Sequence, residues 1–292
     1  MDFQKINRSI DVEAMQSSRV AMIGGAVGLS YDLARCGLGG ISLVDFDYVS
    51  ATNPARQDFN STDIARRKVE VVAENLLRIN PEIEVECHVM DYCSISCEEY
   101  DRLFGDMDLL IHATDFFPPQ ARGNVEAVRL QKPAMWIGLY QGGRAGEIIY
   151  YVPGLTPACY RCICSSRYQA FSRGGASVSS AGGTIFDLHL VDAIAGHNVV
   201  GILTRGADNR YGRLIDKLGN RNLLQVKNDP DWTLGDKDVF RQYLGDQPAN
   251  FSFTTIALPM ERDSNCPDCS HLYRQDNDNS NLLTGYETDS SN

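Results

Sequence analysis

Two apolar segments near the N-terminus enclose a glycine-rich turn and a helical segment, and this pattern constrains the fold more than any other. Residues 19–25 (RVAMIGG) predict a strand that ends in glycines, and residues 41–47 (ISLVDFD) predict a strand that ends in acids. Such a βαβ unit is typical of a Rossmann-like nucleotide-binding sheet. Because Gly24, Gly25 and Gly28 do not complete a G-x-G-x-x-G motif, the pattern also fits glycines that serve only close packing.

Helical and strand patterns continue to alternate along the chain. Residues 62–81 carry apolar side chains at helical spacing, with Thr62 as a candidate N-cap and Pro81 just past the end. Strand patterns follow at residues 83–89, 107–115, 134–140, 211–230 and 250–258. We therefore predict an α/β fold, a Rossmann-like open sheet with an added β-rich part near the C-terminus.

Acidic and basic residues next to these strands indicate the ligand. Asp45 and Asp115 each end a strand, and the carboxyl ends of parallel strands line one crevice, where an acid can hold a ribose or a magnesium ion. Arg56 and Lys68 follow, and such cations favour the phosphates of ATP over a dinucleotide. Taken singly, Arg56 also fits a surface salt bridge and Lys68 a solvated helix residue.

An NAD-dependent oxidoreductase is the alternative for a sheet of this kind. It would need an acid-base residue beside the nicotinamide ring. His112 lies within a predicted strand, and His189 and His197 lie on an apolar helical segment. All three are better interpreted as core histidines whose hydrogen bonds are made within the protein, which disfavours the oxidoreductase.

Composition excludes several other classes of protein. Of the 292 residues, 43% are hydrophobic and 22% are charged, as in ordinary globular proteins, and the net charge of −11 argues against a nucleic-acid partner. The N-terminal residues lack the pattern of a secretory signal, and the apolar run 184–204 contains two acids and two histidines, so we expect a cytoplasmic protein with no membrane segment. Residues 274–292 are polar and acidic and predict a disordered tail.

Four of the nine cysteines form two Cys-x-x-Cys pairs. These are Cys159 with Cys162 and Cys266 with Cys269. Each pair lets two sulfur atoms converge on one ion from a tight turn, so the two together predict a tetrahedral zinc site. A redox dithiol and coincidence are the alternatives, but CPDC lies in a polar loop and not at the start of a helix. The zinc site would tie the C-terminal end of the chain to its middle.

A series of motifs, in this order, resembles the ThiF/MoeB/HesA family, prokaryotic relatives of the ubiquitin-activating enzymes. The motifs are DFDYVSATNPARQ (45–57), RKVE (67–70), RINP (78–81), ATD (113–115), CYRC and CPDC. The resemblance extends from about Arg8 to Cys269. It implies an enzyme that uses ATP and Mg²⁺ to adenylate the C-terminal carboxylate of a small ubiquitin-like or sulfur-carrier protein, with release of pyrophosphate.

The resemblance also implies roles for particular residues. Asp45 matches the ribose-binding acid, Asp47 the second acid of that motif, Lys68 the phosphate-binding lysine and Asp115 the acid associated with magnesium. Arg8 matches an arginine that reaches the phosphates of the neighbouring protomer, which implies a homodimer. The other nucleotide-binding positions are Gly24, Gly25, Gly28, Asn53, Arg56 and Gln57, and the structural zinc ligands are Cys159, Cys162, Cys266 and Cys269.

The domain organisation expected from the resemblance has three parts. Residues 1–18 form an N-terminal arm, and residues 19–273 form the adenylation domain. Its nucleotide-binding half covers about 19–152, and about 153–273 hold the zinc knuckle, a crossover loop and the carrier-binding part. The strand patterns at 211–230 and 250–258 would give a sheet face for the carrier. Residues 274–292 form the tail.

This sequence departs from the family pattern in three places. Its glycine loop is about three residues shorter, and Phe116 follows Asp115 where the family usually has asparagine. The crossover segment, 165–183, contains no cysteine for a thioester and has Ser177 roughly where one is expected. Cys164 is the nearest candidate nucleophile, and the alternative is that it is an ordinary thiol beside the metal. We therefore predict an enzyme that stops at adenylation. Its glycine- and serine-rich loop would become ordered when the carrier tail binds beneath it. A catalytically silent scaffold subunit is the alternative.

Overall fold

The computed structural model describes residues 1–175, 182–233, 238–246 and 253–273. Within these residues a single sheet has the strand order β3-β2-β1-β4-β5-β6-β7-β8. Its strands are β1 (Arg19–Gly24), β2 (Gly40–Val44), β3 (Glu84–His88), β4 (Leu109–Ala113), β5 (Ala134–Leu139), β6 (Ala145–Tyr151), β7 (Leu223–Lys227) and β8 (Thr254–Leu258). The helices are α1 (Val12–Ser17), α2 (Val27–Arg35), α3 (Lys68–Ile79), α4 (Cys97–Phe104), α5 (Phe117–Arg129), α6 (Tyr160–Ile163), α7 (Ser165–Ser172), α8 (Ile185–Leu203), α9 (Leu214–Leu218) and α10 (Val239–Leu244).

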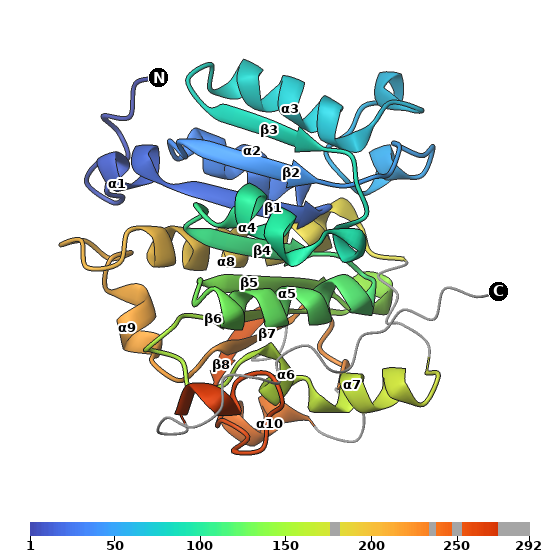
Figure 1. Ribbon diagram of the computed structural model, residues 1–292, viewed down its shortest axis with the longest axis vertical. Coiled ribbons are helices and arrows are strands. Elements are labelled where there is room, and N and C mark those ends of the chain that lie inside the picture. The colour runs from blue at the N-terminus through green and yellow to red at the C-terminus, as the bar shows by residue number, and fades with distance from the viewer. Residues whose placement is uncertain (176–181, 234–237, 247–252, 274–292) are drawn as a thin grey trace.

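The sheet has a parallel half and an antiparallel half. Strands β1 to β5 run parallel, and β6, β7 and β8 continue the same sheet as antiparallel strands. The predicted α/β fold with an added β-rich part is confirmed, and the added part is an extension of the Rossmann-like sheet. Figure 1 shows α4 and α5 in front of the sheet and α8 behind it.

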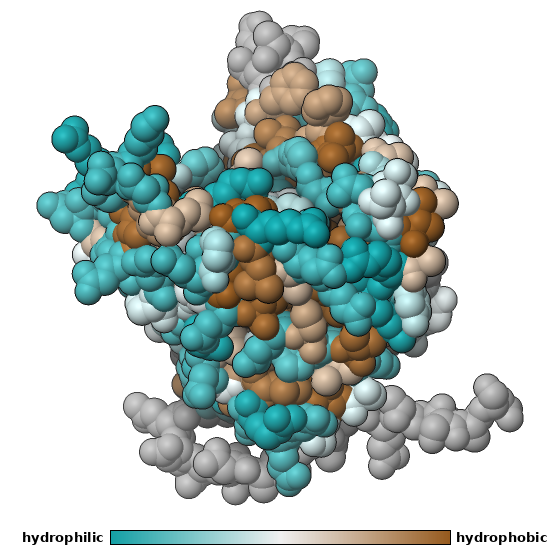
Figure 2. Space-filling view, turned by 90° about the horizontal axis from the view of Figure 1, so that it is seen from above, coloured by the Kyte–Doolittle hydropathy of each residue, from teal (hydrophilic) through white to brown (hydrophobic). Residues whose placement is uncertain are grey.

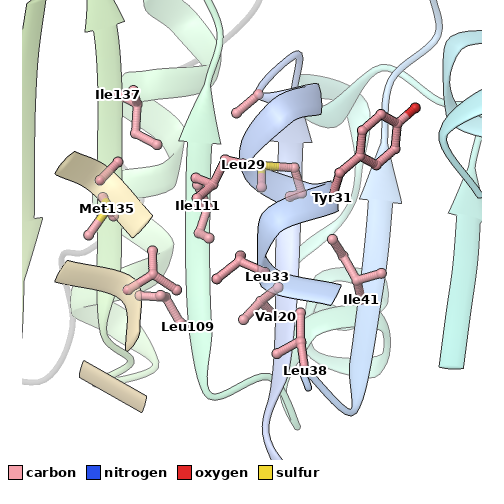
Figure 3. Close-up of a cluster of buried hydrophobic side chains, with 14 of the residues drawn as sticks. Val20, Leu29, Tyr31, Leu33, Leu38, Ile41, Leu109, Ile111, Met135 and Ile137 are labelled. Atoms are coloured by element: carbon pink, nitrogen blue, oxygen red, sulfur yellow. The ribbon is translucent and has the colours of Figure 1, made fainter. Parts of the chain in front are cut away.

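Helices cover both faces of the parallel half, which explains the nearly continuous apolar character of β1, β2, β4 and β5. Figure 3 shows side chains of β1, β2, β4 and β5 on the face of the sheet that α2 and α8 cover, with Leu109 and Ile111 on one face of β4. This alternation follows from the two-residue period of a strand. Helix α8 is long and apolar enough to span a membrane by length and composition alone, but it packs against α2, β5 and β6.

The end of the molecule that carries β3 and α3 is mostly hydrophilic, with apolar side chains in small separate groups (Figure 2). Strand β3 is the edge of the sheet, and its Glu84 and Glu86 carboxylates form ion pairs with Arg19 on β1. Charged side chains on an edge strand oppose pairing with another sheet.

Some predicted element boundaries were wrong. The segment 62–81 begins its α-helix only at Lys68, because Ser61–Asp63 form a separate 3₁₀ turn in which Asn60 and Asp63 cap each other. Thr62 is therefore not the N-cap of α3. Ala65, with a φ of 68°, separates the turn from the helix. The segment 211–230 is not strand throughout, since α9 precedes β7.

The crossover segment 165–183 is also partly helical, since its first eight residues form α7. Ser177 and the tail 274–292 lie outside the described residues. The N-terminal arm is anchored at its end by Met15, which is fully buried on α1 within the main core.

Candidate active site

A cavity of about 470 Å³ lies along the edge of the sheet where the parallel strands end. It extends from the end of β2, marked by Asp45, past Gly24 at the end of β1 and Asp115 after β4, to Tyr140 after β5 and Glu147 on β6. Of the predicted nucleotide and magnesium residues, those that line it are Gly24, Gly25, Asp45, Asp47, Asn53, Arg56, Gln57, Lys68 and Asp115. Residues from four separate segments of the sequence therefore meet at one site.

The glycine turn after β1 allows the chain to pass close to the neighbouring strand end. Gly24 has a φ of 91°, and a Cβ atom there would lie 2.6 Å from the Thr114 side chain and 2.7 Å from the Ala113 carbonyl oxygen. The amide of Gly25 donates to that same carbonyl at 3.0 Å. Glycine is required at position 24 for both reasons. Gly28 does not line the cavity and lies against Asp58, which supports a packing role there.

Asp45, Asp47 and Lys68 form a charged group at the β2 end of the cavity. The Lys68 ammonium lies 2.8 Å from an Asp47 oxygen and 3.9 Å from an Asp45 oxygen. Burial raises the pKa of the Asp45 carboxyl, and the nearby Lys68 charge and the Asp47 backbone amide act in the opposite direction. The start of α3 at Lys68 places its side chain over the end of β2.

The turn around Asn53, which follows β2, is held by its own side chains. The Asn53 Oδ1 atom accepts from the Ser50 amide at 2.7 Å, and the Asn53 amide group donates to Gln57 at 3.0 Å. The Gln57 amide group then donates to the Gly25 carbonyl oxygen at 3.2 Å. These bonds fix the segment that carries Arg56 to the glycine turn.

A buried ion pair at the opposite end of the cavity was missed by sequence reasoning. The Glu147 carboxylate on β6 pairs with both terminal nitrogens of Arg167 on α7, one of them at 2.7 Å, and accepts from the Tyr140 hydroxyl at 2.6 Å. Arg167 also donates to Tyr160, which lies between two zinc-ligand candidates. An acid within the otherwise apolar run 145–151 is the signal that could have identified this pair.

Asp192 on α8 is a second residue of the cavity that the sequence did not single out. Burial raises its pKa to about 7, although its carboxyl accepts the backbone N–H of Leu29 in the first turn of α2. His189, one turn earlier on α8, lies 2.9 Å from Asp58. The N-terminus of α2 therefore faces an acidic side chain. The prediction that His189 and His197 are core histidines was wrong, because both side chains are exposed.

The two cysteine pairs converge in the structure, as predicted. All four sulfur atoms lie within 4.8 Å of one another, and three of the separations are 3.7, 3.7 and 3.5 Å. Four thiolates at a Zn–S distance of about 2.3 Å would be separated by about 3.8 Å, so the cluster fits a tetrahedral zinc ion. Asp268 links the two pairs, because it binds Arg161 at 2.8 Å and Asn124 at 2.7 Å.

Three further residues lie outside the nucleotide-binding end. Cys164 is 5% exposed, and burial raises its pKa to about 12, so an ordinary buried thiol is the better interpretation. His112 is buried and stacked on Trp136, as expected for a core histidine. Neither ring nitrogen has a hydrogen-bond partner in the described residues, so the prediction that its hydrogen bonds are satisfied was wrong. Arg8 is exposed and does not line the cavity of its own chain.

Comparison with known proteins identifies the family. The model of the ThiF family matches residues 2–206. This chain belongs to the ThiF family. The predicted resemblance is confirmed.

Curated relatives of this ThiF-family chain include two proteins named ubiquitin-like modifier-activating enzyme 5. The protein from Caenorhabditis briggsae is 28% identical over 178 residues, which cover 56% of this chain and 40% of the relative. The protein from Drosophila melanogaster is 31% identical over 178 residues, which cover 56% of this chain and 43% of the relative. The chain thus spans less than half the length of these relatives.

Solved structures share the fold over most of the chain. The match to E. coli MccB in complex with ATP has a TM-score of 0.62 and a sequence identity of 21%. It covers 88% of this chain and 68% of the MccB chain. E. coli MccB with MccA-N7isoASN has a TM-score of 0.63, 20% identity and coverages of 88% and 69%. PaaA has a TM-score of 0.58, 18% identity and a coverage of 82% of both chains.

Proposed function

We propose that this ThiF-family chain is an ATP-dependent adenylyltransferase that activates the C-terminal carboxylate of a small ubiquitin-like or sulfur-carrier protein and releases pyrophosphate. One observation carries the proposal: the cavity brings the glycine turn, Asp45, Arg56, Lys68 and Asp115 together at the carboxyl ends of the parallel strands. Ligands of open α/β sheets bind at that edge.

The chemistry of these residues suits a nucleoside triphosphate. Asp45, at the end of β2, would accept hydrogen bonds from ribose hydroxyls. Arg56 and Lys68 supply positive charge for the phosphates, and the exposed Asp47 can release Lys68 to them. Asp115 would hold a magnesium ion, which would neutralise phosphate charge.

Adenylation of a carboxylate needs charge neutralisation and alignment more than proton transfer. The attacking group is already ionised at neutral pH, so no general base is required. Two anions must instead be held in line, which the cations of the cavity favour. The rate enhancement would come from the positions of Arg56 and Lys68.

The nature of the substrate is supported by the names of similar proteins. Two relatives are named as activating enzymes for a ubiquitin-like modifier, and a neighbour in structure was solved with MccA-N7isoASN. We propose that this chain likewise acts on the C-terminus of a small protein. Since Cys164 is buried, the reaction would stop at the acyl-adenylate, and sulfur or an amine would come from a partner.

Three other parts of the proposal concern assembly and location. The exposed Arg8 would complete the phosphate site of a second protomer, so the enzyme would act as a homodimer. The four clustered cysteines would hold a structural zinc ion that ties residues 266–269 to α6. Nine cysteines without a disulfide suit the reducing cytoplasm.

A catalytically silent scaffold subunit is the second candidate, and one observation favours it. The N-terminus of α2 faces the carboxyl group of Asp192, where the fold would otherwise offer backbone N–H groups to phosphate. A chain that had lost phosphate binding could retain the fold and pair with an active partner.

Transfer of AMP tests the proposal directly. The protein is incubated with ATP labelled on its α-phosphate and a candidate ubiquitin-like carrier, and the carrier is assayed for label. The same carrier with an amidated C-terminus is the matched control, because it lacks the attacking carboxylate. Label on the free carboxylate form alone supports adenylation. No label with any carrier contradicts it, and failure to bind ATP as well favours the scaffold.

A further inference from the structure

The two ends of the cavity differ in chemistry. The β2 end carries Asp45, Asp47 and Lys68, whereas the end formed by β5, β6, α7 and α8 is mostly apolar. We call the second part the acyl end and define it by Leu139, Tyr140, Ala170, Phe171 and Leu188, together with Phe116 from the turn between β4 and α5. If the proposed function is correct, ATP occupies the β2 end, and the tail of the activated polypeptide must approach from the acyl end.

The polar group beneath the acyl end carries no net charge to offer a ligand. Glu147 and Arg167 neutralise each other through two contacts, and the Tyr140 hydroxyl donates to the same carboxylate. The Glu147 side chain is 9% exposed. A charged side chain of the substrate would lose hydration here without gaining a partner from the Glu147–Arg167 pair.

Two phenylalanine side chains at the acyl end stay open to solvent although they line a cavity. Phe116 is 54% exposed and Phe171 is 44% exposed. The Phe171 ring lies 5.0 Å from the Phe117 ring, and the Arg167–Glu147 pair ties α7 to the sheet, so the aromatic wall is held in place. Large aromatic faces gain free energy when an apolar group covers them.

We propose that the acyl end is a specificity pocket that takes an apolar side chain from one of the last two residues of the activated polypeptide. Such a side chain would cover Phe116 and Phe171, and it would need no charged partner. A tail that ends in two glycines would leave both aromatic faces in water. Phe116, which stands where the family usually has asparagine, would thus help to determine specificity.

Pyrophosphate exchange with synthetic peptides tests this preference. Pools with the same randomised upstream residues end in Gly-Gly, in Leu-Gly or Gly-Leu, and in Lys-Gly or Asp-Gly. We expect the leucine pools to be used about tenfold more efficiently than the diglycine pool, the size of effect of burying one apolar side chain. The charged pools should be the poorest substrates. Binding of Mg-ATP is measured by calorimetry on the same samples.

Two variants and a matched control assign the preference to the pocket. Phe171→Ala should raise KM for leucine peptides and reduce their advantage over diglycine peptides to about twofold or less, with the Kd of ATP unchanged. Phe116→Ala should act in the same direction. Phe186→Ala removes an exposed phenylalanine on α8 that does not line the cavity, and it should leave the preference intact.

The outcomes separate this inference from the proposed function. Equal use of all pools, a preference for diglycine, or equal losses for all peptides in Phe171→Ala would overturn the specificity pocket alone. No exchange with any pool while ATP binds would overturn the pocket, and the labelled-carrier assay then decides whether adenylation fails with it. Failure of the unaltered protein to bind ATP would overturn the proposed function and the pocket with it.

Discussion

Lys68 is the residue whose position depends most on where a helix begins. It is the first residue of α3, and its ammonium group contacts both acids after β2. The sequence placed it within a helix but did not show that the helix starts there, because the capping interaction of Asn60 and Asp63 forms a separate turn just before it. The motif RKVE predicted its presence in the site, and the geometry brings it there.

Replacement of Lys68 tests the charge that this helix start supplies. Lys68→Met keeps the length of the side chain and removes the ammonium group, so the rate of adenylation should fall by about 10²- to 10³-fold, by analogy with lost oxyanion-hole donors. Lys217→Met, at an exposed position on α9 outside the cavity, is the control and should have normal activity. A loss of less than about threefold in Lys68→Met would contradict a role on the phosphates.

The raised pKa of Asp192 predicts that the stability of the protein depends on pH. This pKa is about 7 in the folded protein and near 4 when unfolded, so the folded state holds the proton more tightly and loses stability as pH rises from about 4 to 7. Asp192→Asn keeps an acceptor for Leu29 without the charge. Its melting temperature should exceed that of the unaltered protein by a few degrees at pH 8, about 2–4 °C for each kcal/mol, and by less at pH 5. The same difference at both pH values would rule out the buried charge as the cause.

At the scale of helices and strands, strand direction explains why the sequence predicted the residues at one end of the cavity and not those at the other. Asp45, Asp115 and the glycine turn follow strands directly, so the rule that parallel strands end at one edge was enough to group them. Glu147 and Arg167 lie on β6 and α7, and β6 runs antiparallel, which reverses the edge at which its residues appear. No local pattern in the sequence shows that reversal, and α7 lies in a segment expected to be a flexible loop.

The Glu147–Arg167 pair should stabilise the contact of α7 with the sheet. Arg167→Met would leave a buried carboxylate unpaired, and the free energy of unfolding should fall by about 3 kcal/mol. Adding Glu147→Gln to that variant should restore part of the loss, since the uncompensated charge is removed. Chemical denaturation of the two single variants and the double variant gives the coupling, and strictly additive losses would show that the two groups act independently.

At the scale of the whole molecule, the cysteine cluster joins parts of the chain that are about a hundred residues apart. Its spacing in the sequence predicted the site, and the sulfur positions fit zinc. Sequence could not supply the link between the two pairs, because Asp268, Asn124 and Arg161 come together only in the fold. The Tyr160 hydroxyl extends this region to Arg167 at the acyl end.

Removal of the metal should therefore loosen the C-terminal end of the described chain first. The purified protein should contain about one zinc ion per chain by elemental analysis. A strong chelator should raise hydrogen exchange in residues 262–273 before it does so in β1 and β2, since the two cysteine pairs lose their common ligand. Cys93→Ser is the control for loss of a thiol elsewhere. A metal-free protein with the same exchange pattern in residues 262–273 would contradict the zinc site.

The central claim is that the cavity binds ATP, and calorimetric titration of the purified protein tests it most directly. Mg-ATP and NAD are titrated separately into the unaltered protein and into Arg56→Ala. The account predicts that Mg-ATP binds, that NAD does not, and that Arg56→Ala weakens binding of Mg-ATP at least tenfold. Binding of NAD in place of ATP, or no binding of either nucleotide, would contradict it.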